Sequence, residues 1–194
     1  MRRIEKLKQE SIRSQYETLK SQINPHFLFN SFNTLLAFIE ESPALAAEYV
    51  EKLSDFYRVI LAYREMEKIS LAEELKLTEN FGYLLKKRFG DNFSLEINVE
   101  TNSYFVAPLV LQMLVENAVK HNVIGKNKPL KVRIELQKDD YILVANNLQL
   151  KLTAEQSTGF GLNGIISRYS MLSERPVIVE ETEQEFRVRV PLLK

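Results

Sequence analysis

The chain has 194 residues, enough for one large domain or two small ones, and its 26 Lys and Arg residues balance its 26 Asp and Glu residues. This balance argues against a nucleic-acid-binding protein, which would carry a basic excess. The absence of cysteine excludes disulfides, thiolate zinc sites and a cysteine nucleophile. No apolar run reaches the roughly 18 residues that span a bilayer. We therefore expect a cytoplasmic chain, tied to a membrane only if a span precedes residue 1.

The first third of the sequence predicts two helices. The first is expected over residues 3–40, where an apolar stripe recurs at spacings of three and four residues: Ile12, Tyr16, Leu19, Ile23 and Phe27. Ser42 and Pro43 then supply an N-cap and a first-turn proline for a second helix. Because their connection is short, the two helices should run antiparallel. The second helix carries a heptad-like seam, formed by Ala46, Tyr49, Leu53, Phe56, Ile60 and Tyr63.

One hairpin cannot bury two apolar stripes by itself. Two hairpins can, as a four-helix bundle, so we expect a homodimer with residues 19–64 at its interface. The alternative is that the hairpin packs against the rest of its own chain. We take residues 1–66 as a first domain and residues 67–194 as a second.

The second domain predicts an α/β layer. Ser70 and Glu73 form a capping-box pattern that opens a helix over 71–89. Alternating or continuous apolar runs predict the strands, and 3.6-residue periodicity predicts the helices. Further helices are expected over 109–121 and 162–173, and strands over 93–99, 132–136, 141–145, 177–179 and 186–190. This order favours a mixed sheet covered by helices on one face, so the whole chain is α+β: a helical hairpin followed by a two-layer sandwich.

His26 follows a proline inside the stretch 22–30. A proline within a helix removes a backbone donor and bends the helix. A histidine beside such a bend is mostly uncharged at neutral pH and can act as a nucleophile. The alternative is an inert histidine that is hydrogen-bonded at a helix interface.

A polar patch is predicted on the helix 109–121. Asn117, Lys120 and His121 are three and four residues apart and therefore share one face. An amide oxygen, an ammonium and an imidazole suit a magnesium–phosphate group. The alternative is an ordinary solvated helix face.

Two further segments are candidates for nucleotide contacts. Gly159-Phe160-Gly161 lies just before a helix, where glycines let backbone N–H groups approach a phosphate. Asn146 and Asn147 end an apolar strand, where their amides either read a base edge or close a turn.

Three segments together resemble sensor histidine kinases of the autolysin-regulator class. Residues 19–36, LKSQINPHFLFNSFNTLL, resemble the phospho-acceptor stretch of that class. Residues 108–122, PLVLQMLVENAVKHN, resemble its asparagine box, and residues 157–169, STGFGLNGIISRY, resemble its second glycine box. The resemblance implies a dimeric hairpin that bears the histidine, followed by an ATP-binding domain like those of gyrases and Hsp90-type chaperones.

The resemblance also implies roles for single residues. His26 would attack the γ-phosphate of ATP, Glu116 would orient or deprotonate the attacking group, and Asn30 would hold the imidazole tautomer. Asn117 would coordinate Mg2+, and the lid would be residues 148–158. The nucleotide-binding positions would be Asn117, Lys120, His121, Asn146, Gly159 and Gly161.

Some positions depart from the family pattern. Residues 146–150 read Asn-Asn-Leu-Gln-Leu where the family has Asp-x-Gly-x-Gly, so we expect weak ATP binding. Gly164 stands where an asparagine is expected, and Phe27 follows the histidine where other kinase classes carry an acid. The leading interpretation is a kinase that autophosphorylates on His26 and passes the phosphate to an aspartate of a response-regulator receiver domain. The alternatives are a degenerate kinase acting as a dimeric scaffold or phosphatase, and a chaperone-type ATPase.

Overall fold

The computed structural model describes residues 25–63, 66–100, 103–151 and 161–194. The chain forms two compact units, Met1–Val50 and Glu51–Lys194, which divide inside the second helix of the hairpin. The domain boundary expected between residues 66 and 67 stays a prediction. The part of the predicted first helix that precedes residue 25 lies outside the described residues.

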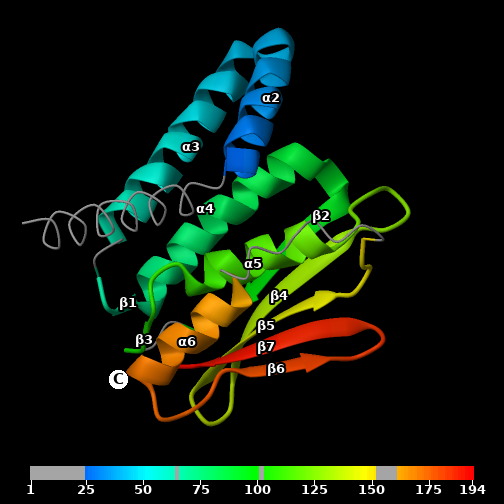
Figure 1. Cartoon of the computed structure of the whole chain (residues 1–194). Helices are drawn as coiled ribbons and strands as arrows, with labels where there is room; N and C mark the ends of the chain where they lie inside the picture. The colour runs from blue at the N-terminus through cyan, green and yellow to red at the C-terminus, as the bar shows by residue number, and fades with distance from the viewer. Residues whose placement is uncertain (1–24, 64–65, 101–102, 152–160) are drawn as a thin grey trace, which may run out of the picture. The chain divides into compact units, whose positions relative to one another are not determined.

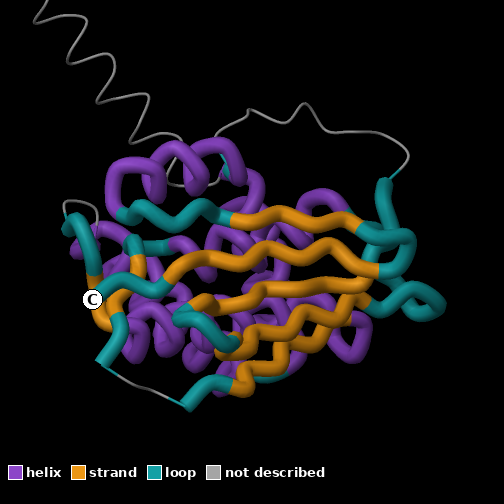
Figure 2. The backbone as a smooth tube through the Cα atoms, turned by 90° about the horizontal axis from the view of Figure 1, so that it is seen from below, coloured by secondary structure: helices purple, strands orange, loops and turns teal. Residues whose placement is uncertain are grey.

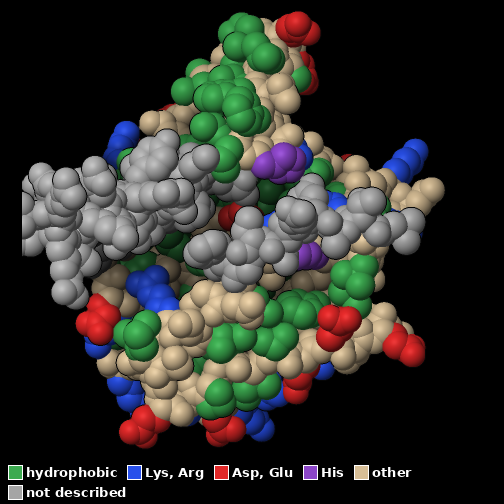
Figure 3. Space-filling view, in the orientation of Figure 1, with side chains coloured by type: hydrophobic (Ala, Val, Ile, Leu, Met, Phe, Trp, Pro, Cys, Tyr) green, Lys and Arg blue, Asp and Glu red, His purple; other side chains and the backbone are tan. Residues whose placement is uncertain are grey.

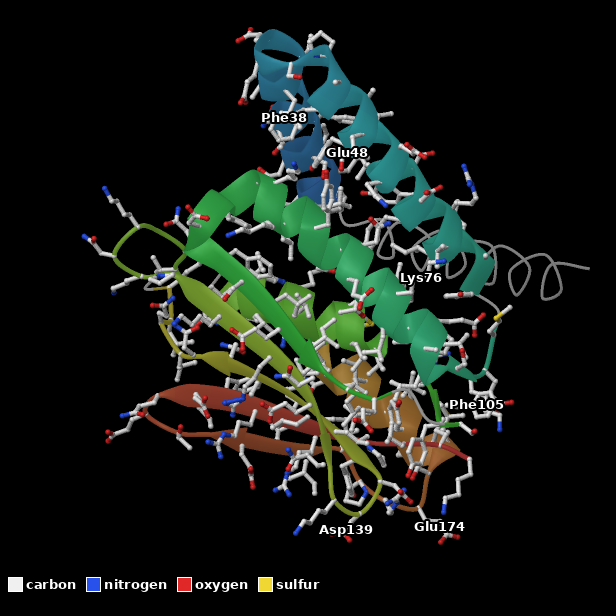
Figure 4. All side chains as sticks on the ribbon, turned by 180° about the vertical axis from the view of Figure 1, so that it is seen from behind. Phe38, Glu48, Lys76, Phe105, Asp139 and Glu174 are labelled. Carbon is white, nitrogen blue, oxygen red and sulfur yellow. The ribbon has the colours of Figure 1, made fainter. Side chains whose placement is uncertain are left out.

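The predicted hairpin is present. Helix α2 spans Pro25–Glu41 and helix α3 spans Pro43–Tyr63, and the chain reverses direction at Ser42 (Figure 1). The N–H of Ser42 donates to the carbonyl of Phe38 at 2.8 Å, which closes the last turn of α2. The ring of Phe38, labelled in Figure 4, meets Tyr49 edge-on with centroids 5.5 Å apart. This aromatic contact fixes the two helices close to their connection.

The apolar seam of α3 is buried within the single chain. Phe56 stacks on Phe81 of helix α4 (Leu71–Phe89) with ring centroids 5.2 Å apart. The Asn80 amide, one residue earlier on α4, donates to the carbonyl of Lys52 at 3.1 Å. The seam residues that are buried are Ala46, Tyr49, Leu53, Phe56 and Ile60. Part of the seam that we expected between two chains therefore packs against the rest of its own chain.

A mixed five-stranded sheet forms the base of the second unit, as predicted. Its strands lie in the order β2-β4-β5-β7-β6. Strands β2 and β4 pair in parallel, and every other pair is antiparallel. The strands are β2 (Phe93–Asn98), β4 (Leu130–Gln137), β5 (Tyr141–Asn147), β6 (Ile178–Glu181) and β7 (Glu185–Pro191).

Helices α4, α5 (Val110–His121) and α6 (Leu162–Leu172) cover one face of this sheet (Figure 2). Val132 and Ile134 of β4 are buried on that face. Between them, Arg133 points to the other face and pairs with Glu185 at 3.1 Å. This period-two alternation explains why one face packs against helices and the other carries charge, and it confirms the two-layer sandwich.

Short elements connect the hairpin to this layer. Strand β1 (Ile69–Ser70) pairs with β3 (Phe105–Val106), a two-stranded sheet that the sequence did not predict. The predicted capping box is present: Ser70 Oγ accepts from the N–H of Glu73 at 3.3 Å, and Glu73 Oε2 accepts from the N–H of Ser70 at 3.1 Å. A 3-10 turn at Gly90–Asn92 ends α4.

Candidate phosphoryl-transfer site

Helix α5 carries most of the candidate site, and a carboxylate from another helix caps its start. Leu109, the residue before α5, is left-handed with φ of 68° and makes no side-chain cap. Instead, Glu74 of α4 accepts from the N–H groups of Leu109 and Leu111, each at 2.8 Å. Complete burial raises the pKa of Glu74 to about 7, against the opposing effect of these N–H groups and of the Arg168 guanidinium. This cap fixes the axis of α5, and with it the side chains farther along.

The predicted polar patch lies on α5. Asn117, Lys120 and His121 are half-buried and share one face of the helix. The opposite face packs into the core through Leu111, Leu114, Val115 and Ala118. An amide, an ammonium and an imidazole are thus held together at the C-terminal end of a well-packed helix.

Gln112 orients Glu116, the acidic residue next to Asn117. Gln112 is only 6% exposed, and its Nε2 donates to Glu116 Oε2 at 2.8 Å. A buried amide that holds a half-buried carboxylate restricts the rotamers of that carboxylate. Sequence reasoning missed Gln112. The signal that could have found it is a polar residue on the apolar face of an amphipathic helix.

The structure brings Gly161 next to Asn117. A Cβ added to Gly161 would stand 3.3 Å from Asn117 Oδ1, so the lack of a side chain leaves this oxygen uncrowded. A hard cation such as Mg2+ prefers such an amide oxygen together with phosphate oxygens and water. The residues present therefore fit a magnesium–nucleotide group. Gly159, the other predicted glycine, lies outside the described residues.

The two asparagines at the end of β5 have different roles. Asn147 donates to the carbonyl of Pro129 at 3.0 Å and accepts from the N–H of Lys131 at 2.7 Å, so it ties β5 to the start of β4. Asn146 is 5% exposed, and its Nδ2 donates to the carbonyl of Asn147 at 2.8 Å. That bond uses the donor side of the Asn146 amide and leaves Oδ1 as the acceptor. The adenine contact implied for Asn146 stays a prediction.

The first part of the predicted lid is bonded to the end of α5. Asn122 Oδ1 accepts from the N–H of Gln149 at 2.7 Å, and the N–H of Lys151 donates to the carbonyl of His121 at 3.1 Å. Gln149 Nε2 also donates to three carbonyls of the loop that follows α5: those of Val123, Lys128 and Pro129. Residues 148–151 therefore form a fixed base beside His121, and the rest of the predicted lid lies outside the described residues.

His26 lies in the other unit, in the first turn of α2, and is exposed. Phe27, where other kinase classes carry an acid, is 7% exposed and belongs to the core. Asn30 Nδ2 donates at 2.6 Å to the backbone oxygen of His26. This bond ties Asn30 to the main chain of the histidine. The role that we expect for Asn30, holding the imidazole tautomer, stays a prediction.

Comparisons with known proteins agree with these observations. The family model for histidine kinases matches residues 14–93. The sensor protein LytS of Staphylococcus saprophyticus is 36% identical over 110 residues, which is 56% of this chain and 19% of that protein. The sensor histidine kinase/phosphatase LytS of Staphylococcus aureus gives the same identity and coverage. The chain thus spans about a fifth of the length of these relatives.

Solved histidine kinases are more distant. The Acinetobacter baumannii histidine kinase AdeS is 16% identical with a TM-score of 0.44, over 82% of this chain and 83% of that one. The catalytic domain of the histidine kinase ThkA is 15% identical with a TM-score of 0.43, over 64% of this chain and 93% of that one.

Residues 14–93 of this chain are therefore similar to histidine kinases. Over 110 residues the chain is also similar to the LytS sensor proteins of two Staphylococcus species.

Proposed function

We propose that this chain transfers the γ-phosphate of ATP to His26 and then passes it to an aspartate of a response-regulator receiver domain. The observation that carries the proposal is the exposed histidine of α2, which lies inside the segment that the histidine kinase family model matches. The Asn117–Gly161 contact supports a nucleotide site on the second unit.

The chemistry needs few groups because phosphoryl transfer depends mainly on positioning and charge stabilisation. A nitrogen of the His26 imidazole attacks the γ-phosphorus, the bond to the β-phosphate oxygen breaks, and ADP leaves. Glu116, oriented by Gln112, takes the proton that the phosphorylated ring loses. Mg2+ held by Asn117 would neutralise phosphate charge, and Lys120 and His121 would contact the phosphates. In the second step the N–P bond breaks and an aspartyl phosphate forms.

We also propose a homodimer formed through the hairpin. With the α3 seam buried inside the chain, most of the large exposed hydrophobic side chains of the hairpin lie on α2. Figure 3 shows hydrophobic side chains gathered over the hairpin. On α2, four of them recur at spacings of three and four residues: Phe29, Phe32, Leu36 and Ile39, which are 67%, 46%, 61% and 54% exposed. A stripe of this kind marks an interaction surface, and a second copy of the hairpin would cover it in a four-helix bundle.

We place this activity in the cytoplasm, because ATP and receiver domains are found there. Among the described helices, none is long and apolar enough to cross a membrane.

Incubation with γ-labelled ATP and Mg2+ tests the function. Acid-labile label on the protein, which moves to an isolated receiver domain, is the expected result. Free phosphate without protein label would indicate a chaperone-type ATPase. Absence of both would indicate the scaffold alternative, which the family matches do not favour.

A further inference from the structure

Arg168 of α6 bonds to the backbone of two separate connections. Its Nη2 donates to the carbonyls of Met66 at 3.0 Å and Glu67 at 3.5 Å, in the segment that joins α3 to β1. Its Nη1 donates to the carbonyl of Pro108 at 3.2 Å, just before α5. A planar guanidinium is suited to this bridging because its N–H groups diverge in a fixed fork.

The surroundings hold Arg168 in place. Its positive charge acts on the Glu74 carboxylate, which is buried at the start of α5. The next residue, Tyr169, is buried, and its hydroxyl accepts from the N–H of Ala107 at 3.0 Å. These contacts fix α6 against the start of α5 on two sides. The Arg168 guanidinium is therefore held in position for its bonds to the three backbone carbonyls.

The segment at Met66 and Glu67 is exposed and is held by fewer contacts than α6. Both residues are exposed, and the side chain of Met66 is 47% exposed. The N–H of Met66 makes a 3.2 Å bond to the carbonyl of Tyr63, which lies within the same stretch. The Arg168 bonds therefore tie this segment to a packed helix.

The other end of α6 reaches the nucleotide site. Gly161, directly before α6, is the residue that lies against Asn117. Arg168 comes seven positions after Gly161, which corresponds to about 10 Å along a helix. A single rigid element thus connects the site at Asn117 with the segment that leads back to α3.

We propose that Arg168 is a positioning residue for phosphoryl transfer. It ties the α3–β1 segment to α6, so the arrangement of the nucleotide site is passed to the end of α3, the helix whose first part lies in the histidine-bearing unit. This inference rests on the proposed kinase function. It predicts that loss of the Arg168 fork leaves nucleotide binding intact but impairs transfer, because the segment is no longer held in one geometry.

Three variants separate the possibilities. Arg168→Met keeps the apolar stem and removes the fork. Arg168→Lys keeps the charge near Glu74, but a single ammonium cannot reach both connections. Arg175→Met is the matched control, since Arg175 also donates to backbone carbonyls, those of Asp139 and Leu192, in the same unit.

The primary measurement is hydrogen exchange of the backbone amides in residues 66–70, without nucleotide. Two further measurements are ATP affinity by calorimetry and the initial rate of labelling of the protein at saturating ATP. In Arg168→Met we expect exchange to be faster by about tenfold, since the segment opens more often. We expect the labelling rate to fall by about tenfold, and the ATP dissociation constant to change by less than about twofold. Arg168→Lys should show the same effects in weaker form, and Arg175→Met should match wild type.

Unchanged exchange in Arg168→Met would overturn the inference whatever the activity. A parallel loss of ATP affinity and of thermal stability would also overturn it, because Arg168 would then only support the fold. If the wild-type chain takes up no label, the proposed kinase function fails instead, and the exchange measurement still decides whether Arg168 holds the segment.

Discussion

Asn117 and Gly161 come from different helical segments, and a Cβ on Gly161 would stand 3.3 Å from Asn117 Oδ1. This contact is tighter than ordinary packing, so Gly161→Ala should push the amide aside by a few tenths of an ångström. We expect ATP affinity to fall by about fivefold, on the order of 1 kcal/mol, because one hydrogen-bond or metal contact weakens. Calorimetry measures this effect.

Gly164→Ala is the matched control for that substitution. A Cβ there meets nothing within 4 Å, and the residue lies inside α6. It should leave ATP affinity unchanged and add up to about 1 kcal/mol of stability through helix propensity. Equal affinities of wild type and Gly161→Ala would show that Gly161 does not shape the site.

Glu74 makes stability depend on pH. Its pKa is about 7 in the folded protein and 4.5 ordinarily. The native state therefore binds more protons than the unfolded chain between these values, and the free energy of unfolding falls as pH rises from about 4.5 to about 7, by about 3 kcal/mol. Urea unfolding at several pH values measures this change.

Glu74→Gln should remove most of that pH dependence, because the amide does not titrate. Glu73→Gln is the control: the Ser70 hydroxyl and N–H lower the pKa of Glu73, so this residue titrates below the window. The same slope in wild type and Glu74→Gln would contradict this assignment.

The exposed stripe on α2 gives a clean test of dimerisation. Phe32→Glu combined with Leu36→Glu should yield a folded monomer by light scattering, since these side chains are 46% and 61% exposed within the single chain. Asp at the buried Leu53 and Phe56 should instead unfold the chain, because it places charge in the core. A wild-type chain that is monomeric at micromolar concentration would rule out the bundle.

Asn146→Asp should tighten ATP binding and lower stability. A carboxylate accepts an adenine N–H bond more strongly than an amide does, by on the order of 1 kcal/mol. The same carboxylate loses the bond from Nδ2 to the carbonyl of Asn147 and faces that oxygen instead. We expect about fivefold higher affinity by calorimetry and a lower melting temperature.

Asn147→Asp serves as the control for the adenine contact. Asn147 donates to Pro129 and has no expected role in binding, so its substitution should cost stability without a gain in affinity. If Asn146→Asp binds ATP no more tightly than wild type, adenine is recognised elsewhere.

Most elements could be predicted because their signals are local. The Ser70–Glu73 capping box located the start of α4, and strict alternation located β4. The strands β1 and β3 were missed because two residues each are too few to show a period. Periodicity also shows that one face of α3 is buried, but it does not show what covers that face. We expected a second chain, whereas Phe56 stacks on Phe81 of the same chain.

The site was predictable to the extent that its residues share one helix. Asn117, Lys120 and His121 were found from spacing and resemblance. Glu74 and Arg168 were missed, because each acts on the backbone of a distant segment and no local pattern marks such a bond. A glutamate in the first turns of α4 looks like an ordinary dipole-complementing residue until the fold places it at the start of α5.

His26 is the residue that we expect to receive the phosphate. The most direct measurement compares acid-labile labelling from γ-labelled ATP in wild type, His26→Gln and His121→Gln, with ATP affinity measured on each. We expect no label on His26→Gln with unchanged affinity, and label on His26 in wild type and, more slowly, in His121→Gln. Stable acid-labile phosphate on His26→Gln would contradict it.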